Sequence, residues 1–330
     1  MKAYIVSETG GPDVLRLQDI PNPVVGAGEV RIKVRAFGVN RVEVDRRSGV
    51  YGPITHPTVL GIEAVGEVIE DPSGLYRPGH RVATAMGGLG YDRAGSYAEQ
   101  LVTRRENIVS LEDAQLPWNE LAALPEAFLT AWGTLTPALR ISSGHCLLVR
   151  GAATSVGRAT IILARRLGAT VIATTRRESQ REPLLALGAQ HVIIDEGEIA
   201  SRLREIWPRG ADAAIELVGA STIRDTMRAV RPYGEVGTIG VLGGRFLEKF
   251  DLLTDLPDAV SLRFFPSSFL GTPALPLGNA PLEHIAIQQA AGHAPSILGH
   301  TFAFEQVPEA HALIETNQTL GKVVIIHNDN

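Results

Sequence analysis

Residues 145–157 read HCLLVRGAATSVG, an apolar run followed by small residues and the start of a helical pattern. At such a junction the helix N-terminus offers free backbone N–H groups and a partial positive charge, which suit a pyrophosphate. Small side chains let the backbone approach the ligand closely. The usual three-glycine pattern falls on Ala152, Thr154 and Gly157, so a purely structural turn is the alternative. The predicted contacts to a dinucleotide are Ala152, Ala153, Thr154, Ser155, Val156 and Gly157.

The segments around this stretch alternate between strand and helix patterns. Strands are predicted at residues 145–150, 170–175, 191–194, 211–217 and 235–241. Helices are predicted between them, at residues 156–167, 178–187, 198–206 and 221–230. Strands that alternate with helices of this length indicate a doubly wound α/β domain, whose parallel sheet is covered on both faces.

The end of the second predicted strand bears on the choice of dinucleotide. Proteins that bind NAD place an Asp or Glu there, which accepts a hydrogen bond from the ribose 2′-OH. This chain has Thr175, Arg176 and Arg177 instead, and the first acid is Glu178. Because Arg binds phosphate through two parallel hydrogen bonds, the pair favours the 2′-phosphate of NADPH. A solvated arginine pair at a helix entry is the alternative.

The N-terminal part of the chain is rich in strand patterns broken by Gly and Pro. Apolar residues alternate with Arg and Lys over residues 30–36, and similar strands are predicted at 65–69, 81–84 and 97–103. Short strands of this kind predict a compact, barrel-like β domain.

The remaining segments complete the predicted domain organisation. Further elements are expected as helices at residues 119–139 and 308–315 and a last strand at 322–326, in a tail that returns to the first domain. The predicted domains are residues 1–118, a β-rich catalytic domain, residues 119–275, a dinucleotide-binding domain, and residues 276–330, part of the first domain.

The composition excludes several classes of protein. With 330 residues, 45% of them hydrophobic, and a net charge of −5, the chain is neither disordered nor suited to nucleic acid. The single cysteine, Cys146, is expected to be an inert core residue and suits a reducing compartment. No window of about 18 apolar residues predicts a membrane span, so we expect a soluble, cytoplasmic protein.

Short motifs recur along nearly the whole chain in a fixed order. They are residues 38–40 with 47–51, then 60–66, 78–82, 95–99, 130–132, 187–189 and 321–324. Each motif is weak alone. Together their order and spacing resemble the zinc-independent, zeta-crystallin-like quinone oxidoreductases of the medium-chain dehydrogenase/reductase superfamily.

This resemblance implies a GroES-like catalytic domain, a Rossmann cofactor domain, an active site in the cleft, NADPH as hydride donor and a homodimer. Asn40 and Tyr51 stand at the family positions that face nicotinamide and substrate, and are therefore the expected catalytic residues. By the same correspondence, the other residues near the cofactor are Thr130, Gly240, Val241 and Lys322.

Zinc-dependent alcohol dehydrogenases of the same superfamily hold their catalytic metal with a Cys and a Gly-His-Glu segment. The corresponding residues here are Asn40 and Gly61-Ile62-Glu63, so no metal is expected. Without a metal to polarise an alcohol, reduction of a quinone or an α,β-unsaturated carbonyl compound fits best, with a proton from Tyr51 or water. An enoyl-thioester reductase and a non-catalytic NADPH-binding protein are the alternatives.

The expected homodimer also has support in the residues. Residues 259–265 form an apolar, β-prone run after the last βα unit. At the open edge of a sheet such a strand would pair with a second copy across a two-fold axis. An internal strand covered by the tail is the alternative.

Overall fold

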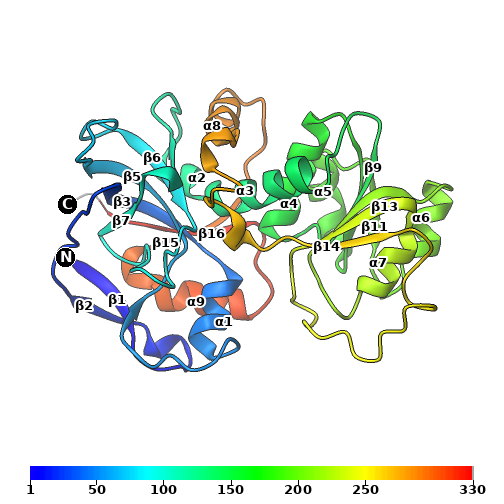
Figure 1. The fold of residues 1–330 in the computed structure, drawn as a ribbon, viewed down its shortest axis with the longest axis horizontal. Helices are drawn as coiled ribbons and strands as arrows, with labels where there is room; N and C mark the ends of the chain where they lie inside the picture. Colours follow the sequence, from blue (N-terminus) through cyan, green and yellow to red (C-terminus); the bar gives the residue numbers. More distant parts are fainter. Residues whose placement is uncertain (329–330) are drawn as a thin grey trace. The chain divides into compact units, whose positions relative to one another are not determined.

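The computed structural model describes residues 1–328, which form two compact units (Figure 1). Unit 1 contains residues 1–129 and the C-terminal segment from 268 onward, and unit 2 contains residues 130–267. We predicted the first limit at residue 118, but in the structure it lies at residue 129. The reason is that helix α2 (Trp118–Ala122) packs on strands of unit 1. Leu121 and Leu124 are fully buried there. The second limit lies before the predicted residue 275.

Unit 2 contains the predicted doubly wound sheet. All six strands are parallel, in the spatial order β11, β10, β9, β12, β13, β14, so that the order reverses between β9 and β12. The strands are β9 (Cys146–Arg150), β10 (Thr170–Thr175), β11 (His191–Ile194), β12 (Ala211–Glu216), β13 (Val230–Thr238) and β14 (Ser261–Phe264). The helices between them are α4 (Ser155–Arg166), α5 (Arg181–Ala186), α6 (Ala200–Ile206) and α7 (Ile223–Ala229).

Several predicted elements differ in their bounds from those in the structure. The helix predicted at 119–139 is divided into α2, α3 (Pro125–Gly133) and a π-helical turn (Thr134–Ala138), which contains a proline. The last strand was predicted at 235–241, but β13 begins at Val230 and ends at Thr238 because it pairs with β12 from its first residue. Helix α7 is correspondingly shorter than predicted.

Unit 1 is built around two β-sheets. One has the order β2 (Arg16–Asp19), β1 (Lys2–Val6), β4 (Thr58–Val59). The other has the order β15 (Leu298–Ala303), β16 (Lys322–Ile326), β3 (Glu29–Val39), β5 (Glu63–Glu70), β6 (Arg81–Ala85), β8 (Ile108–Ser110), and β7 (Gln100–Arg104) also pairs with β3. Besides α2, the helices of unit 1 include α1 (Arg41–Ser48), α8 (Leu282–Ala290) and α9 (Val307–Glu315), and α1 lies beside α9 (Figure 1).

The antiparallel pairing of three strands brings distant parts of the sequence together. Strand β3 ends where its neighbours β5 and β16 begin, since Val39 lies opposite Val323 and Ala36 opposite Val65. Asn40, Glu63 and Lys322 therefore meet at one edge of the sheet. The sequence motifs that contain them are separated by up to about 280 residues.

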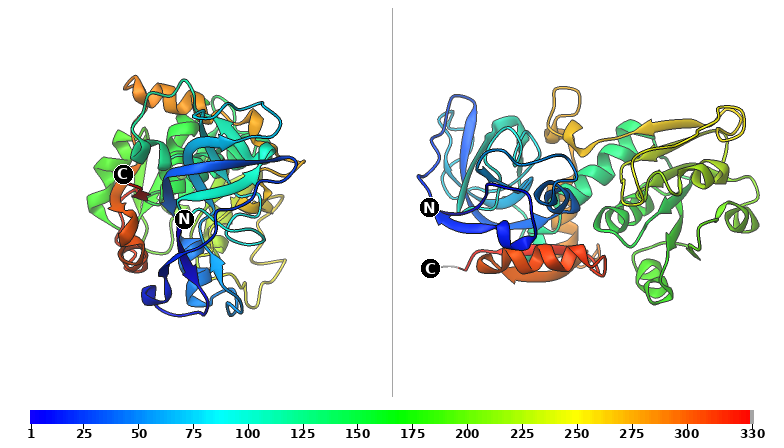
Figure 2. Two further views of the ribbon diagram at one scale, coloured as in Figure 1. Left: turned by 90° about the vertical axis from the view of Figure 1, so that its left-hand side faces the viewer. Right: turned by 90° about the horizontal axis from the view of Figure 1, so that it is seen from below.

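Strand β14 lies at the edge of the sheet in unit 2, as predicted for the run at 259–265. All four of its residues are exposed, Leu262 and Phe264 among them. Between β13 and β14 the chain makes a long connection without helix or strand (yellow in Figure 2). No helix within residues 1–328 has the length and apolar character needed to cross a membrane.

Candidate functional site

The loop after β9 forms a cradle at the N-terminus of α4. Gly151 adopts a left-handed backbone (φ 82°), and the Thr154 hydroxyl caps the helix by accepting a hydrogen bond from the Gly157 N–H at 3.1 Å. No residue in the described chain accepts a hydrogen bond from the N–H of Ser155 or Val156. Two helix-start donors therefore have no acceptor among the described residues.

Gly157, the one glycine retained from the usual pattern, has a clear physical role. A Cβ at this position would lie 2.6 Å from the Cα of Ala152, which belongs to the loop that the helix packs against. Only glycine lets α4 start this close to β9. Ala152 is itself fully buried, whereas Ala153, Thr154, Ser155 and Val156 are partly exposed.

The loops after β12 and β13 lie at the same carboxyl edge of the sheet. The buried Glu216 carboxylate accepts hydrogen bonds from the N–H groups of Val218 and Gly219, which shapes the first loop. Gly240 in the second loop has no room for a side chain, because the Leu217 carbonyl lies against it. Of the other residues predicted near the nicotinamide, Val241 is exposed, while Thr130 is buried and its carbonyl accepts a bond from Thr134.

The end of β10 has the polarity predicted for a phosphate site. Thr175 is buried and its hydroxyl accepts a hydrogen bond from the Arg177 N–H, while the side chains of Arg176 and Arg177 are exposed. The nearest acid, Glu178, forms an ion pair with Arg181 at 2.5 Å. The acid next to Arg176 and Arg177 in the sequence is therefore already paired with another cation, Arg181.

One residue of this region was not singled out from the sequence. Arg158, in the first turns of α4, is 9% exposed and joins two loops. Its Nε donates to the Ala153 carbonyl at 3.2 Å and its Nη2 donates to Gln180 Oε1 at 2.7 Å. Burial lowers the pKa of Arg158, and no described carboxylate lies within ion-pair distance of it. The only sequence signal was an arginine after the loop glycine.

A second buried arginine, Arg150, also escaped the sequence analysis. It ends β9 and is fully buried, with Nε and Nη2 bonded to Asp195 at 2.8 and 2.9 Å. Its Nη1 is bonded to Asp225 at 2.7 Å and to Thr226 at 3.1 Å. Burial would raise the pKa of Asp195, but the Arg150 guanidinium outweighs burial and lowers it. This network ties together the ends of β9, β11 and α7, which support the cradle.

In unit 1, Asn40, Glu63 and Lys322 form a buried polar cluster. The Lys322 ammonium lies 2.6 Å from Glu63 Oε1, with both side chains 1% exposed, and also donates to Asn40 Oδ1. The Asn40 amide group donates to Glu63 Oε1 at 2.9 Å and to Glu43 Oε1 at 3.3 Å. Burial alone would lower the pKa of Lys322, but the charge of Glu63 raises it above its ordinary value.

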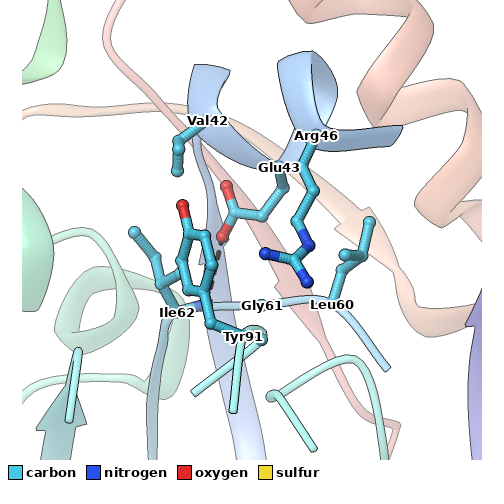
Figure 3. A pocket seen from close by; sticks show the side chains of 8 residues that line it. Val42, Glu43, Arg46, Leu60, Gly61, Ile62 and Tyr91 are labelled. Atoms are coloured by element: carbon cyan, nitrogen blue, oxygen red, sulfur yellow. Dashed lines mark hydrogen bonds between the residues drawn. The ribbon is translucent and has the colours of Figure 1, made fainter. Parts of the chain in front are cut away.

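Glu43 is a second buried carboxyl group, bonded to Asn40 of this cluster. Figure 3 shows its side chain in the pocket that Tyr91 and Arg46 also line. It accepts hydrogen bonds from the N–H of Asn40 at 2.7 Å, which caps α1, and from the N–H of Ile62 at 3.1 Å. Burial, together with the nearby charge of Glu63, raises the pKa of Glu43 to about 8. The Tyr91 ring covers this site and is stacked with the Arg46 guanidinium, 4.4 Å from the ring centroid.

The two predicted catalytic residues differ in their surroundings. Tyr51 is 47% exposed in the loop after α1. Both donor hydrogens of the Asn40 amide are directed at carboxylates. Asn40 is therefore part of the cluster with Glu63 and Lys322, while Tyr51 lies at the surface of unit 1.

The residues at the zinc positions do not fit a metal ion. Ile62 has no donor atom, and the Lys322 ammonium is bonded to both Asn40 and Glu63, where it would repel a cation. Across residues 1–328 the structure brings no group of three His, Cys, Asp or Glu side chains into a metal-binding arrangement. Cys146 is fully buried, and burial raises the pKa of its thiol to about 12.

Comparisons with known proteins agree with this architecture. Residues 26–113 match the alcohol dehydrogenase GroES-like domain, and residues 155–263 match the zinc-binding dehydrogenase family. Together the two matches span more than half of the chain.

Similar proteins extend over nearly the full length. A 2-haloacrylate reductase from Burkholderia is 28% identical, over 98% of both chains. Human quinone oxidoreductase is 27% identical, over 99% of this chain and 98% of the relative. The structure of a mycobacterial protein complexed with NADPH is 27% identical, with a TM-score of 0.85 over 99% of this chain and all of the other. The chain belongs to the medium-chain dehydrogenase/reductase superfamily and is similar to its zinc-independent quinone oxidoreductases.

Proposed function

We propose that this protein is an NADPH-dependent reductase of quinones or α,β-unsaturated carbonyl compounds that works without zinc. The observation that carries the proposal is the carboxyl edge of the sheet in unit 2. There a helix-start cradle with two unpaired N–H groups stands next to a strand end that has two exposed arginines and no acid. NADPH supplies a hydride when bound.

Each part of the cofactor has candidate partners in this chain. The N–H groups of Ser155 and Val156 would bind the pyrophosphate, and Arg176 and Arg177 the 2′-phosphate. Gly240, Val241 and Thr130 would contact the nicotinamide. Lys322 was expected near the cofactor as well. Because its ammonium is bonded to Glu63 and Asn40, we propose that it holds these two side chains in place.

The absence of zinc from the proposal follows from the Lys322 cluster. An ammonium ion already bonds the two side chains that stand at metal-ligand positions. We propose that this fixed cation balances Glu63 where related enzymes use a metal. Elemental analysis should find no stoichiometric zinc, and chelators should leave turnover unchanged. Zinc bound at Asn40 and Glu63 would refute this part.

The acceptor is proposed from the names of the relatives and the chemistry of the site. Quinones and 2-haloacrylate, named for the relatives, are electrophilic and accept hydride without metal activation. The Tyr51 hydroxyl would then donate the proton, or orient a water that does.

The experiment that tests the proposal is steady-state kinetics with a panel of quinones, enones and enoyl thioesters. We expect turnover with NADPH to exceed that with NADH by tenfold or more. Replacing both Arg176 and Arg177 by Ala should raise the KM for NADPH about tenfold to hundredfold and leave that for NADH nearly unchanged. Thioester-only turnover would favour an enoyl-thioester reductase, and binding without turnover a non-catalytic NADPH-binding protein.

We also propose a homodimer in a reducing, cytoplasmic compartment. The exposed edge strand β14, with Leu262 and Phe264 uncovered, supports pairing with a second copy. Light scattering at micromolar concentration should give twice the mass of the chain. A monomeric mass would refute the dimer.

A further inference from the structure

Arg158 is buried without an acidic partner, and such burial is unfavourable. A guanidinium has five N–H donors. Within the described chain the Arg158 side chain makes two hydrogen bonds, one to the Ala153 carbonyl and one to Gln180 Oε1. Both acceptors are neutral. A buried charge without a counterion costs several kcal/mol unless an anion joins it.

The hydrogen bonds that Arg158 makes to the loop after β9 and to the turn after β10 do not require a positively charged side chain. The link between α4 and the turn Glu178–Gln180 could be made by a neutral amide at position 158, without desolvating a cation. Arg150, eight residues earlier, is a buried arginine with a structural role, and two carboxylates, Asp195 and Asp225, neutralise its charge. Arg158 is as buried as a structural arginine, but it has no carboxylate partner, which is typical of an arginine that binds an anionic ligand.

The position of Arg158 indicates which anion would join it. One of its bonds reaches the loop after β9, and the other reaches Gln180, whose N–H bonds the Arg177 carbonyl in the turn after β10. The guanidinium thus lies between the loop proposed for the pyrophosphate and the turn that begins with Arg176 and Arg177. In a doubly wound fold the adenosine ribose binds between these two segments.

We infer that Arg158 is a third guanidinium of the 2′-phosphate site and makes the buried contact to the phosphate. This inference rests on the proposed function and adds a specificity-determining residue to it. Arg176 and Arg177 would contact the phosphate from the solvent side, where their hydrogen bonds are weakened by water. The buried contact of Arg158 would contribute the larger share of the discrimination between NADPH and NADH.

Gln180 offers a test in which stability and binding are expected to change in opposite directions. Gln180→Glu is nearly isosteric and places a carboxylate 2.7 Å from the Arg158 guanidinium. The new ion pair should raise or maintain the thermal midpoint. Because it competes with the phosphate, it should weaken binding of 2′,5′-ADP at least tenfold and change binding of 5′-AMP less than threefold. Gln180→Met is the matched control: it removes the bond without adding charge, and should leave the ratio of the two affinities within threefold.

Calorimetric titration of the full-length protein with 2′,5′-ADP and 5′-AMP separates the outcomes. If the wild type prefers 2′,5′-ADP but Gln180→Glu keeps that preference, Arg158 does not contact the phosphate and only this inference is wrong. If the variant weakens both nucleotides equally, Arg158 acts on the fold, and the inference is again overturned. If the wild type binds neither nucleotide, or both equally, the NADPH proposal fails with it.

Discussion

Each unit buries a cationic side chain among acidic ones, but the two clusters balance their charge differently. In unit 2, Arg150 pairs with Asp195 and Asp225, whose side chains are 8% and 15% exposed. In unit 1, Lys322 pairs with Glu63, and Glu43 is a further buried carboxyl that forms no ion pair with the described residues.

This difference indicates how each cluster stays neutral. Arg150 lowers the pKa of Asp195, which reaches the edge of the solvent, so Asp195 stays charged. Burial raises the pKa of Glu216, which shares the Thr226 hydroxyl with Arg150. Glu43 is cut off from water, and burial raises its pKa to about 8, so it holds a proton at neutral pH. We therefore expect both clusters to be sensitive to loss of the cation, and the stability of unit 1 to fall as the pH rises through the raised pKa of Glu43.

The largest effect on stability is expected for Arg150→Met. The variant would leave Asp195 and Asp225 without their cation and should lower the free energy of unfolding by roughly 4–5 kcal/mol. Urea denaturation followed by circular dichroism measures this. Arg228→Met is the control, since that arginine is 54% exposed and 3.9 Å from Asp255, and should cost less than about 1 kcal/mol. Equal losses in the two variants would mean that the buried network is dispensable.

A somewhat smaller loss, about 3 kcal/mol, is expected for Lys322→Met, because one buried carboxylate would lose its partner. The same denaturation experiment applies. Adding Glu63→Gln should restore most of the loss, since the carboxylate that lost its partner is then replaced by a neutral amide. A double variant that is no more stable than the single one would show that packing, rather than charge, explains the effect.

The next effect is the pH dependence of stability that Glu43 contributes. A proton on Glu43 is held in the folded state and released on unfolding between the ordinary pKa of 4.5 and about 8. Stability from this group is complete below pH 4.5 and is lost as the pH rises through 8. Subtracting the pH profile of Glu43→Gln from that of the wild type should isolate this fall. The exposed Glu178→Gln should leave the profile unchanged, and an equally steep profile in both variants would contradict the assignment.

The smallest change in stability is expected outside both clusters, at Tyr51. Tyr51→Phe keeps the shape of an exposed side chain and should alter the free energy of unfolding by less than about 0.5 kcal/mol. If its hydroxyl delivers or orients the proton, turnover should still fall by roughly a hundredfold. Wild-type turnover and KM for every acceptor would make Tyr51 a structural residue.

Much of the secondary structure of unit 2 could be predicted from local sequence patterns. Residues 170–175 and 191–194 form strands with the predicted bounds, because buried parallel strands leave unbroken apolar runs in the sequence. The helix start, predicted at residue 156 and found at Ser155, and the arginines after β10 also follow from neighbouring residues alone. Short-range chemistry sets both, since caps and turns involve residues three to five apart.

The sequence by itself thus determined the βα alternation, the loop at residues 151–157 and the polarity of the strand end at residues 175–177. Only the tertiary structure decided which charges are buried together. Lys322 meets Asn40 and Glu63 because β3 is antiparallel to both β5 and β16, and a register between distant strands leaves no local signal. The same holds for Arg150 and Arg158. Each is a single arginine in the sequence, and its role depends on whether folding brings a carboxylate to it.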